Sequence, residues 1–160
     1  MRRADSRPPK PPSRRRPSHG VKPPAVGPVL VFLTVCTSQR RRWLAQCDVH
    51  DRLLEVWADN SRWRVGRYVL LPDHLHLFAA PTESESDFDH WVRYWKSLSR
   101  RNLPKEYEWQ DQHWDRRLRS GESYADTWEY VRSNPVRHGL ASHPDEWQFQ
   151  GELNKIDWPW

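Results

Sequence analysis

Two histidines separated by a single leucine constrain this chain more than any other feature of its sequence. They lie near the end of the apolar stretch Tyr68-Val-Leu-Leu-Pro-Asp-His-Leu-His-Leu-Phe-Ala-Ala-Pro81. The alternation of His74 and His76 with leucines predicts a half-buried strand with both imidazoles on one face. Pro72-Asp73 predicts a tight turn before this strand, because proline presets φ and aspartate bonds its own backbone.

Two imidazoles on one face of a strand can both reach a single metal ion. The alternative is a surface strand that happens to carry two histidines. We favour metal ligation, because polar residues at alternate positions are unusual inside so apolar a run.

The basic charge of the chain is concentrated at its N-terminus. Residues 1–28 hold eight of the 26 lysines and arginines, one of the 21 acidic residues and eight of the 14 prolines. Such a segment cannot bury enough apolar surface to order itself, so we expect a disordered tail at 1–28 and a folded domain at 29–160. The tail is either a basic arm that adds affinity for phosphates or a dispensable solvated extension.

Several classes of protein are excluded by composition. Cys36 and Cys47 have no metal-binding or redox spacing, and two thiols do not indicate a disulfide-stapled secreted module. No apolar run approaches the roughly 20 residues that span a membrane. We expect a soluble protein of a reducing compartment.

The sequence of residues 29–160 predicts strands that alternate with amphipathic helices. The expected elements are a strand at 29–35, a helix at 48–59 with Asp48 as a possible cap, strands at 63–71 and 74–79, a helix at 87–100 with Ser86 as a possible cap, and a strand at 109–118. This order predicts an α+β fold, a ferredoxin-like antiparallel sheet with helices on one face. We expect most of the 11 tryptophans to be core or loop residues rather than base-stacking platforms.

The helix at 87–100 carries a basic stripe beside its apolar one. Arg93, Lys96 and Arg100 follow the i, i+3, i+7 spacing of one helix face. Such a stripe is usually a solvated face. Because it lies in the next helix after the paired histidines, we predict that it contacts a phosphate backbone.

A further helix begins after Gly121, with Ser123 as its N-cap. Its buried stripe is formed by Tyr124, Trp128 and Val131, and Tyr130 points away from this stripe. A tyrosine held off the core on a rigid helix can be a nucleophile, although spacing alone favours an ordinary surface residue. Asn134 lies on the same side and can either ligate a metal or cap a short helix that starts at Pro135 and stops at Gly139.

These residues resemble a known family. The pair Tyr68-Val-Leu-Leu-Pro-Asp-His-Leu-His-Leu-Phe and Tyr130-Val-Arg-Ser-Asn-Pro-Val-Arg-His-Gly-Leu is similar to motifs of the REP-associated tyrosine transposases, which are single-tyrosine HUH endonucleases (His-hydrophobe-His). Trp109-Gln110, His113-Trp114-Asp115, Arg119-Ser-Gly-Glu-Ser-Tyr124 and Trp147 fit the same family. The resemblance spans about Val29 to Trp158, and the sequence departs from the family in its long Pro/Arg tail and in Gln148-Phe-Gln150.

The resemblance implies a transposase that binds single-stranded or hairpin DNA at REP elements, cuts it and rejoins it in DNA transposition or recombination. Carried over by position, Tyr130 becomes the nucleophile and His74, His76 and Asn134 the metal ligands. The ion would be Mg²⁺ or Mn²⁺. The resemblance also implies a prokaryotic, cytoplasmic and nucleoid-associated protein, acting as a monomer, with a dimer not excluded.

Two other functions fit the same residues. One is a non-catalytic relic that binds hairpin DNA without cutting it, and the other is a metal-dependent hydrolase in which water attacks instead of Tyr130. The remaining histidines we treat as surface or structural residues, and only His138 is close enough to Asn134 in sequence to serve as a spare ligand.

Overall fold

A computed structural model describes residues 28–59, 62–83, 87–119 and 122–158. The predicted tail, apart from Pro28, and the predicted cap Ser86 therefore lie outside the described residues. Among the helices of the described part, none is long and apolar enough to cross a membrane. Cys36 and Cys47 are both free thiols.

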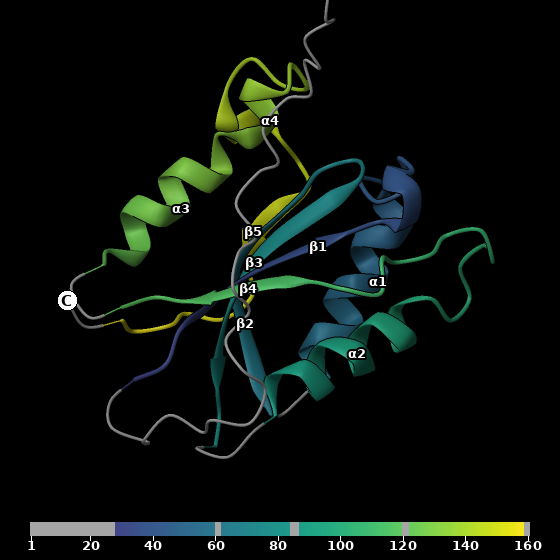
Figure 1. Cartoon of the computed structure of the whole chain (residues 1–160). Coiled ribbons are helices and arrows are strands. Elements are labelled where there is room, and N and C mark those ends of the chain that lie inside the picture. The colour runs from purple at the N-terminus through teal and green to yellow at the C-terminus, as the bar shows by residue number, and fades with distance from the viewer. Residues whose placement is uncertain (1–27, 60–61, 84–86, 120–121, 159–160) are drawn as a thin grey trace, which may run out of the picture.

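Five antiparallel strands form one sheet in the order β4-β1-β3-β2-β5 (Figure 1). The strands are β1 Val31–Cys36, β2 Trp63–Leu70, β3 His74–Pro81, β4 Trp114–Arg117 and β5 Gln150–Glu152. The helices are α1 Cys47–Ala58, α2 Phe88–Ser99, α3 Tyr124–Arg132 and α4 Asn134–Arg137, with 3-10 turns at Ser38–Arg40 and Pro144–Glu146. The order of the first four strands is that of a ferredoxin-like sheet, so the predicted fold is confirmed.

The expected strand at 109–118 is shorter than predicted. Only Trp114–Arg117 forms a strand, while Trp109 makes an isolated bridge to Thr37. Strand β5 was not predicted, because its three residues are too few to show a period-two pattern.

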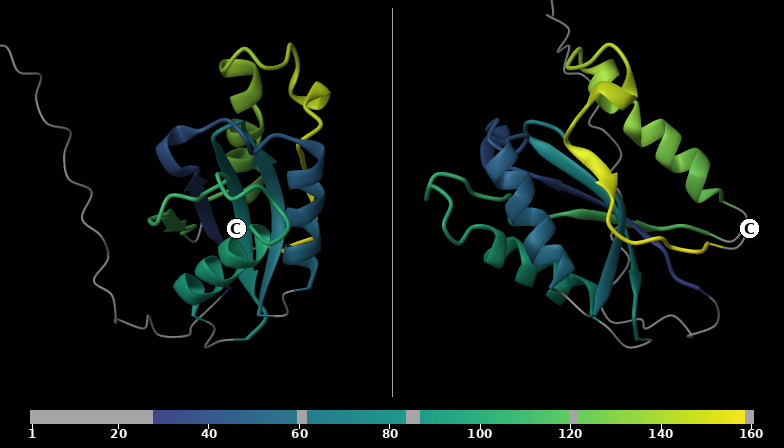
Figure 2. Two further views of the ribbon diagram at one scale, coloured as in Figure 1. Left: turned by 90° about the vertical axis from the view of Figure 1, so that its right-hand side faces the viewer. Right: turned by 180° about the vertical axis from the view of Figure 1, so that it is seen from behind.

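Helices α1 and α2 cover one face of the sheet, which we call the core face (Figures 1 and 2). Inward side chains of the three central strands pack there against the apolar stripes of both helices. This cluster includes Leu33, Leu75, Leu77, Leu53, Trp57, Trp91 and Trp95. Eight of the 11 tryptophans are buried, as expected.

Helix α3 packs on the opposite face, which we call the site face because it carries His74 and His76. Tyr124, Trp128 and Val131 form the buried stripe of α3, as predicted, and contact Phe78 and Val69 of the sheet cluster. The expectation of helices on one face thus holds for α1 and α2, while α3 forms a second layer. Ser123 caps α3 by accepting a hydrogen bond from the backbone N–H of Asp126.

A glycine in β2 lets α3 approach the sheet closely. The β2–β3 register shifts between Val65 and Tyr68, and a Cβ on Gly66 would lie 2.6 Å from the Tyr124 hydroxyl. That hydroxyl accepts a hydrogen bond from the backbone N–H of Arg67 at 2.9 Å. The position of α3 on the sheet therefore depends on residue 66 being a glycine, which has no side chain.

We predict that Gly66→Ala lowers the free energy of unfolding by about 1–3 kcal/mol, because overpacking forces Tyr124 from its position. Urea denaturation of Gly66→Ala, Tyr124→Phe and the double variant measures this. The alanine should cost less in the Tyr124→Phe background, where the opposing oxygen is gone. An equal cost in both backgrounds would show that Tyr124 is not the obstacle.

Candidate nucleic-acid cleavage site

The paired histidines lie on the site face of β3, at the end of the strand that follows the Pro72-Asp73 turn. Their ring centroids are 5.0 Å apart. His74 is 8% exposed and His76 is half-buried, while Leu75 and Leu77 are fully buried in the core cluster. The predicted alternation of β3 is therefore confirmed, and it delivers both imidazoles to one side.

Each histidine is oriented through its Nδ1 atom. Nδ1 of His74 donates to a carboxylate oxygen of Asp73 at 2.7 Å, and Nδ1 of His76 lies 2.8 Å from the hydroxyl of Thr34. The ring of His76 also stacks on Phe32, with centroids 5.4 Å apart. Contacts of this kind fix the ring and direct the other nitrogen, Nε2, toward a ligand.

Burial keeps both imidazoles neutral. It lowers the pKa of His74 despite the nearby Asp73 carboxylate, and it lowers the pKa of His76 to about 3, with further lowering by the charges of His74, Arg137, His138 and Arg40. A neutral imidazole is the form that binds a metal. The donor set therefore fits a divalent cation, and Asn134 or His138 could complete it.

Arg40 contacts the ends of two strands beside the histidines. It donates to Asp73 at 2.9 Å and to the Cys36 sulfur at 2.9 Å, so that Asp73 bridges a cation and His74. Burial acts to raise the pKa of Asp73, but hydrogen bonds from His74 and Arg40 outweigh it and lower the pKa. Gln39 and Arg40 both have φ of 54°, a backbone conformation that side chains other than glycine rarely adopt.

Tyr130 is exposed, in contrast to the other tyrosine of α3. It is 69% exposed, whereas Tyr124 is 7% exposed and burial raises its pKa to about 12. The predicted direction of Tyr130, away from the buried stripe, is therefore confirmed. Its role as nucleophile stays a prediction.

Arg137 connects Tyr130 with Asn134. Its guanidinium lies 4.2 Å from the centre of the Tyr130 ring, donates to the Tyr130 carbonyl at 3.0 Å and donates to the side-chain oxygen of Asn134. Asn134 does not cap a helix, because it is itself the first residue of α4 and Ser133 precedes it. The competitor for its oxygen is thus Arg137, while Gly139 ends the segment at φ 70° as predicted.

His138 lies closer to the paired histidines than its treatment as a surface or structural residue suggested. Its ring centroid is 6.0 Å from that of His74. In the sequence, only its short spacing to Asn134 indicated that His138 could be a ligand. Arg137 and His138 together bring the α3–α4 corner next to the end of β3 that carries the histidines.

Two residues of the predicted basic stripe, Lys96 and Arg100, bond to backbone carbonyls of this chain, and the contact of the stripe with a phosphate backbone stays a prediction. Lys96 is buried and donates to the carbonyl oxygens of Gln110 and Asp111, at 2.6 and 3.3 Å, and Arg100 donates to the carbonyls of Tyr107 and Lys105. Arg93 is exposed, and within the described part of the chain it makes no such bond to a backbone carbonyl. All three lie on the helix that covers the core face, so the contacts of Lys96 and Arg100 hold the 105–111 loop instead.

One group of three possible metal ligands occurs elsewhere in the described part of the chain. His113 Nε2 lies 2.9 Å from Asp89 and 3.7 Å from Asp115. Asp115 pairs with Leu33 of β1, whose side chain is in the core cluster. Because cross-strand partners share a face, this group lies on the core face, away from His74 and His76.

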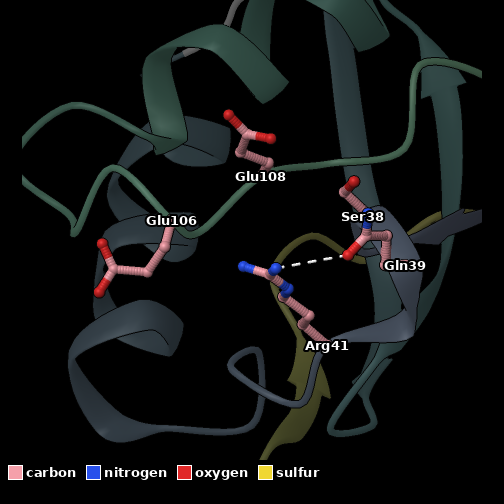
Figure 3. Close-up of a pocket in the computed structure, with 5 residues that line it drawn as sticks. All are labelled: Ser38, Gln39, Arg41, Glu106 and Glu108. Atoms are coloured by element: carbon pink, nitrogen blue, oxygen red, sulfur yellow. Dashed lines mark hydrogen bonds between the residues drawn. The ribbon is translucent and has the colours of Figure 1, made fainter.

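Two concave surfaces of the described part contain neither His74 nor His76 in their lining. A small polar pocket is lined by Ser38, Gln39, Arg41, Glu106 and Glu108 (Figure 3). In it, Arg41 donates to the Gln39 side chain at 3.3 Å.

We predict that the metal-free protein loses stability as pH falls from about 6.5 toward 4. The pKa values of His74 and His76 are lower in the folded state than in the unfolded chain, so protons bind preferentially to the unfolded chain in this range. The slope should approach about 1.4 kcal/mol per pH unit for each proton taken up. Denaturation at several pH values measures it, and His76→Gln should flatten it; an unchanged slope in that variant would contradict the assignment.

The sequence and the fold are both similar to those of known proteins. No protein-family profile matches the chain. A REP-associated tyrosine transposase of Escherichia coli (strain K12) is 26% identical over 137 residues, covering 79% of this chain and 82% of the relative. A relative from Haemophilus influenzae is 26% identical over 110 residues, covering 56% of this chain and 62% of that protein.

A solved structure of a REP-associated tyrosine transposase bound to a REP hairpin has the same fold. Its TM-score is 0.65 at 24% identity, covering 76% of this chain and 74% of that chain. The resemblance drawn from the sequence motifs is thus confirmed. We conclude that this chain is similar to REP-associated tyrosine transposases in sequence, and that it shares its fold with a solved one.

Proposed function

We propose that this protein is a metal-dependent endonuclease and transposase that cleaves and rejoins single-stranded DNA at hairpin-forming repeats. The observation that carries the proposal is the pair His74 and His76, held neutral and oriented on the face where α3 presents Tyr130. The kinship with transposases, one of them solved with a REP hairpin, supports a hairpin DNA substrate.

In this mechanism the Tyr130 hydroxyl oxygen attacks the scissile phosphorus. The bond from phosphorus to the 3′ oxygen breaks, that oxygen takes a proton, and the 5′ phosphate remains on the tyrosine. The tyrosine gives up its own proton as the new bond forms. The free 3′ hydroxyl can later attack the phosphotyrosine and reseal the strand, so the bond energy is conserved.

Each residue of the site has a proposed task. His74 and His76 would hold a Mg²⁺ or Mn²⁺ ion with Asn134 as a third ligand, and the ion would polarise the phosphate. Asp73 and Thr34 keep the two rings in place. Arg137, which contacts both Tyr130 and Asn134, offers positive charge where the phosphate oxygens become more negative.

His138 is a second candidate for the third ligand. Its ring is 6.0 Å from that of His74, while the oxygen of Asn134 is engaged by Arg137. Ligation by Asn134 requires that this bond be given up. Ligation by His138 would leave that bond in place, and a third imidazole would favour Mn²⁺ over Mg²⁺.

We predict that His74→Ala and His76→Ala each weaken Mn²⁺ binding by at least about tenfold, because each removes a ligand. Titration calorimetry, or the electron paramagnetic resonance signal of free Mn²⁺, measures this without any DNA. Of Asn134→Ala and His138→Ala, the one with the larger loss identifies the third ligand. His90→Ala, an exposed histidine of α2, is the matched control. Mn²⁺ binding at wild-type strength in the His74/His76 double variant would contradict the metal site.

We predict that Tyr130→Phe abolishes both cleavage and the covalent DNA adduct while folding and DNA affinity remain near wild type. The substitution removes one oxygen from an exposed side chain, so little packing changes. Labelled hairpin DNA is incubated with each variant and Mn²⁺ and resolved on a denaturing gel.

Tyr124→Phe is the matched control on the same helix. It loses the hydrogen bond from the Arg67 N–H and some stability, but should keep the adduct. Survival of the adduct in Tyr130→Phe would reject the assignment, and its loss only in Tyr124→Phe would move the role to that residue. A wild-type protein that binds hairpins without forming an adduct would be the non-catalytic relic.

A further inference from the structure

The site face is covered unevenly. Helix α3 packs over β2 and β3, where Tyr124 contacts Phe78 and the backbone of Arg67. On β1 the residues of the core face are buried, while Phe32 and Thr34 on the site face are only half-buried. All four residues of β4 are exposed. The side of the sheet formed by β1 and β4 is therefore an open strip beside His76.

One tryptophan lies on this strip. Thr34 pairs with His76 on one side and with Trp114 on the other. Directly paired residues point to the same face, so the Trp114 ring shares the site face with the metal ligand. Two strand spacings of about 4.8 Å separate the backbones, which puts Trp114 roughly 10 Å from His76, within one or two nucleotides of it.

Trp114 is unusual in its exposure. It is 47% exposed, whereas the other tryptophans of the described residues are buried or half-buried. Exposing so large an apolar ring on an edge strand is unfavourable in the free protein, and covering it with a flat ligand recovers that free energy. Its neighbours His113 and Asp115 point to the core face, and Trp114 shares the site face of β4 with Arg116, the partner of Phe32.

We propose that Trp114 stacks on an unpaired base of single-stranded DNA beside the phosphate held at His74 and His76. This inference rests on the proposed function. It adds a contact that distinguishes unpaired bases from paired ones. An indole stacks on any base, because every base has a π face, but a base inside a duplex is already stacked on both sides. Trp114 therefore favours a single-stranded flank over a hairpin stem.

The experiment uses the full-length protein and two DNAs that share one hairpin. One DNA carries a single-stranded extension with 2-aminopurine beside the expected cleavage position, and the other ends blunt at the stem. Trp114→Ala and Trp114→Phe are compared with wild type. Tyr94→Ala is the matched control, because Tyr94 is 51% exposed but belongs to α2 on the core side.

We predict that Trp114→Ala weakens binding of the extended hairpin by about 5- to 100-fold. Trp114→Phe should lose less, since a smaller ring still stacks. Wild type should quench 2-aminopurine fluorescence and Trp114→Ala should not. Binding of the blunt hairpin and the melting temperature should be unchanged in both variants, and Tyr94→Ala should match wild type throughout.

Equal affinities of wild type and Trp114→Ala for the extended hairpin, with quenching retained, would overturn the inference. An equal loss on both DNAs would also overturn it, because the contact would then be to the stem. The Tyr130→Phe adduct assay reports separately on cleavage. An adduct that depends on Tyr130 with no effect of Trp114 rejects only the stacking, whereas stacking without any adduct rejects only the cleavage.

Discussion

The pairing of β1 with β3 is the interaction on which the rest of the structure depends. In one register it opposes Leu33 to Leu77 in the main core and Thr34 to His76 on the other face. The same backbone hydrogen bonds thus align the core and orient His76, which we propose as a metal ligand. Because strands β4 and β2 add to either side, this pair also decides which side chains lie beside the site.

The periodicity of the sequence predicted which face of its own strand or helix each side chain occupies. The alternation around His74 and His76 placed the imidazoles on one face, and helical spacing separated exposed Tyr130 from buried Tyr124. Such patterns need only the chain's own period of two or 3.6 residues. The motifs added a resemblance to the REP-associated tyrosine transposases, and the comparisons find the same similarity in sequence and fold.

Contacts between distant segments could not be predicted in this way. Thr34 belonged to an apolar run with nothing to mark it as a partner of His76, and the position of His138 follows from how α4 turns back on the sheet. The burial of Lys96 is a second example, since its helical spacing indicated only a basic stripe. A carbonyl cluster in the 105–111 loop, which no helical pattern reveals, draws its ammonium group inward instead.

Because successive side chains of β3 point to opposite faces, the number of residues in this strand is constrained as strictly as their identity. A strand that gained or lost one residue between the Pro72-Asp73 turn and Leu77 would exchange its two sides. The imidazoles would then enter the tryptophan-rich core without partners, and the leucines would face water. The number of residues from the turn to the second histidine is therefore itself part of the site.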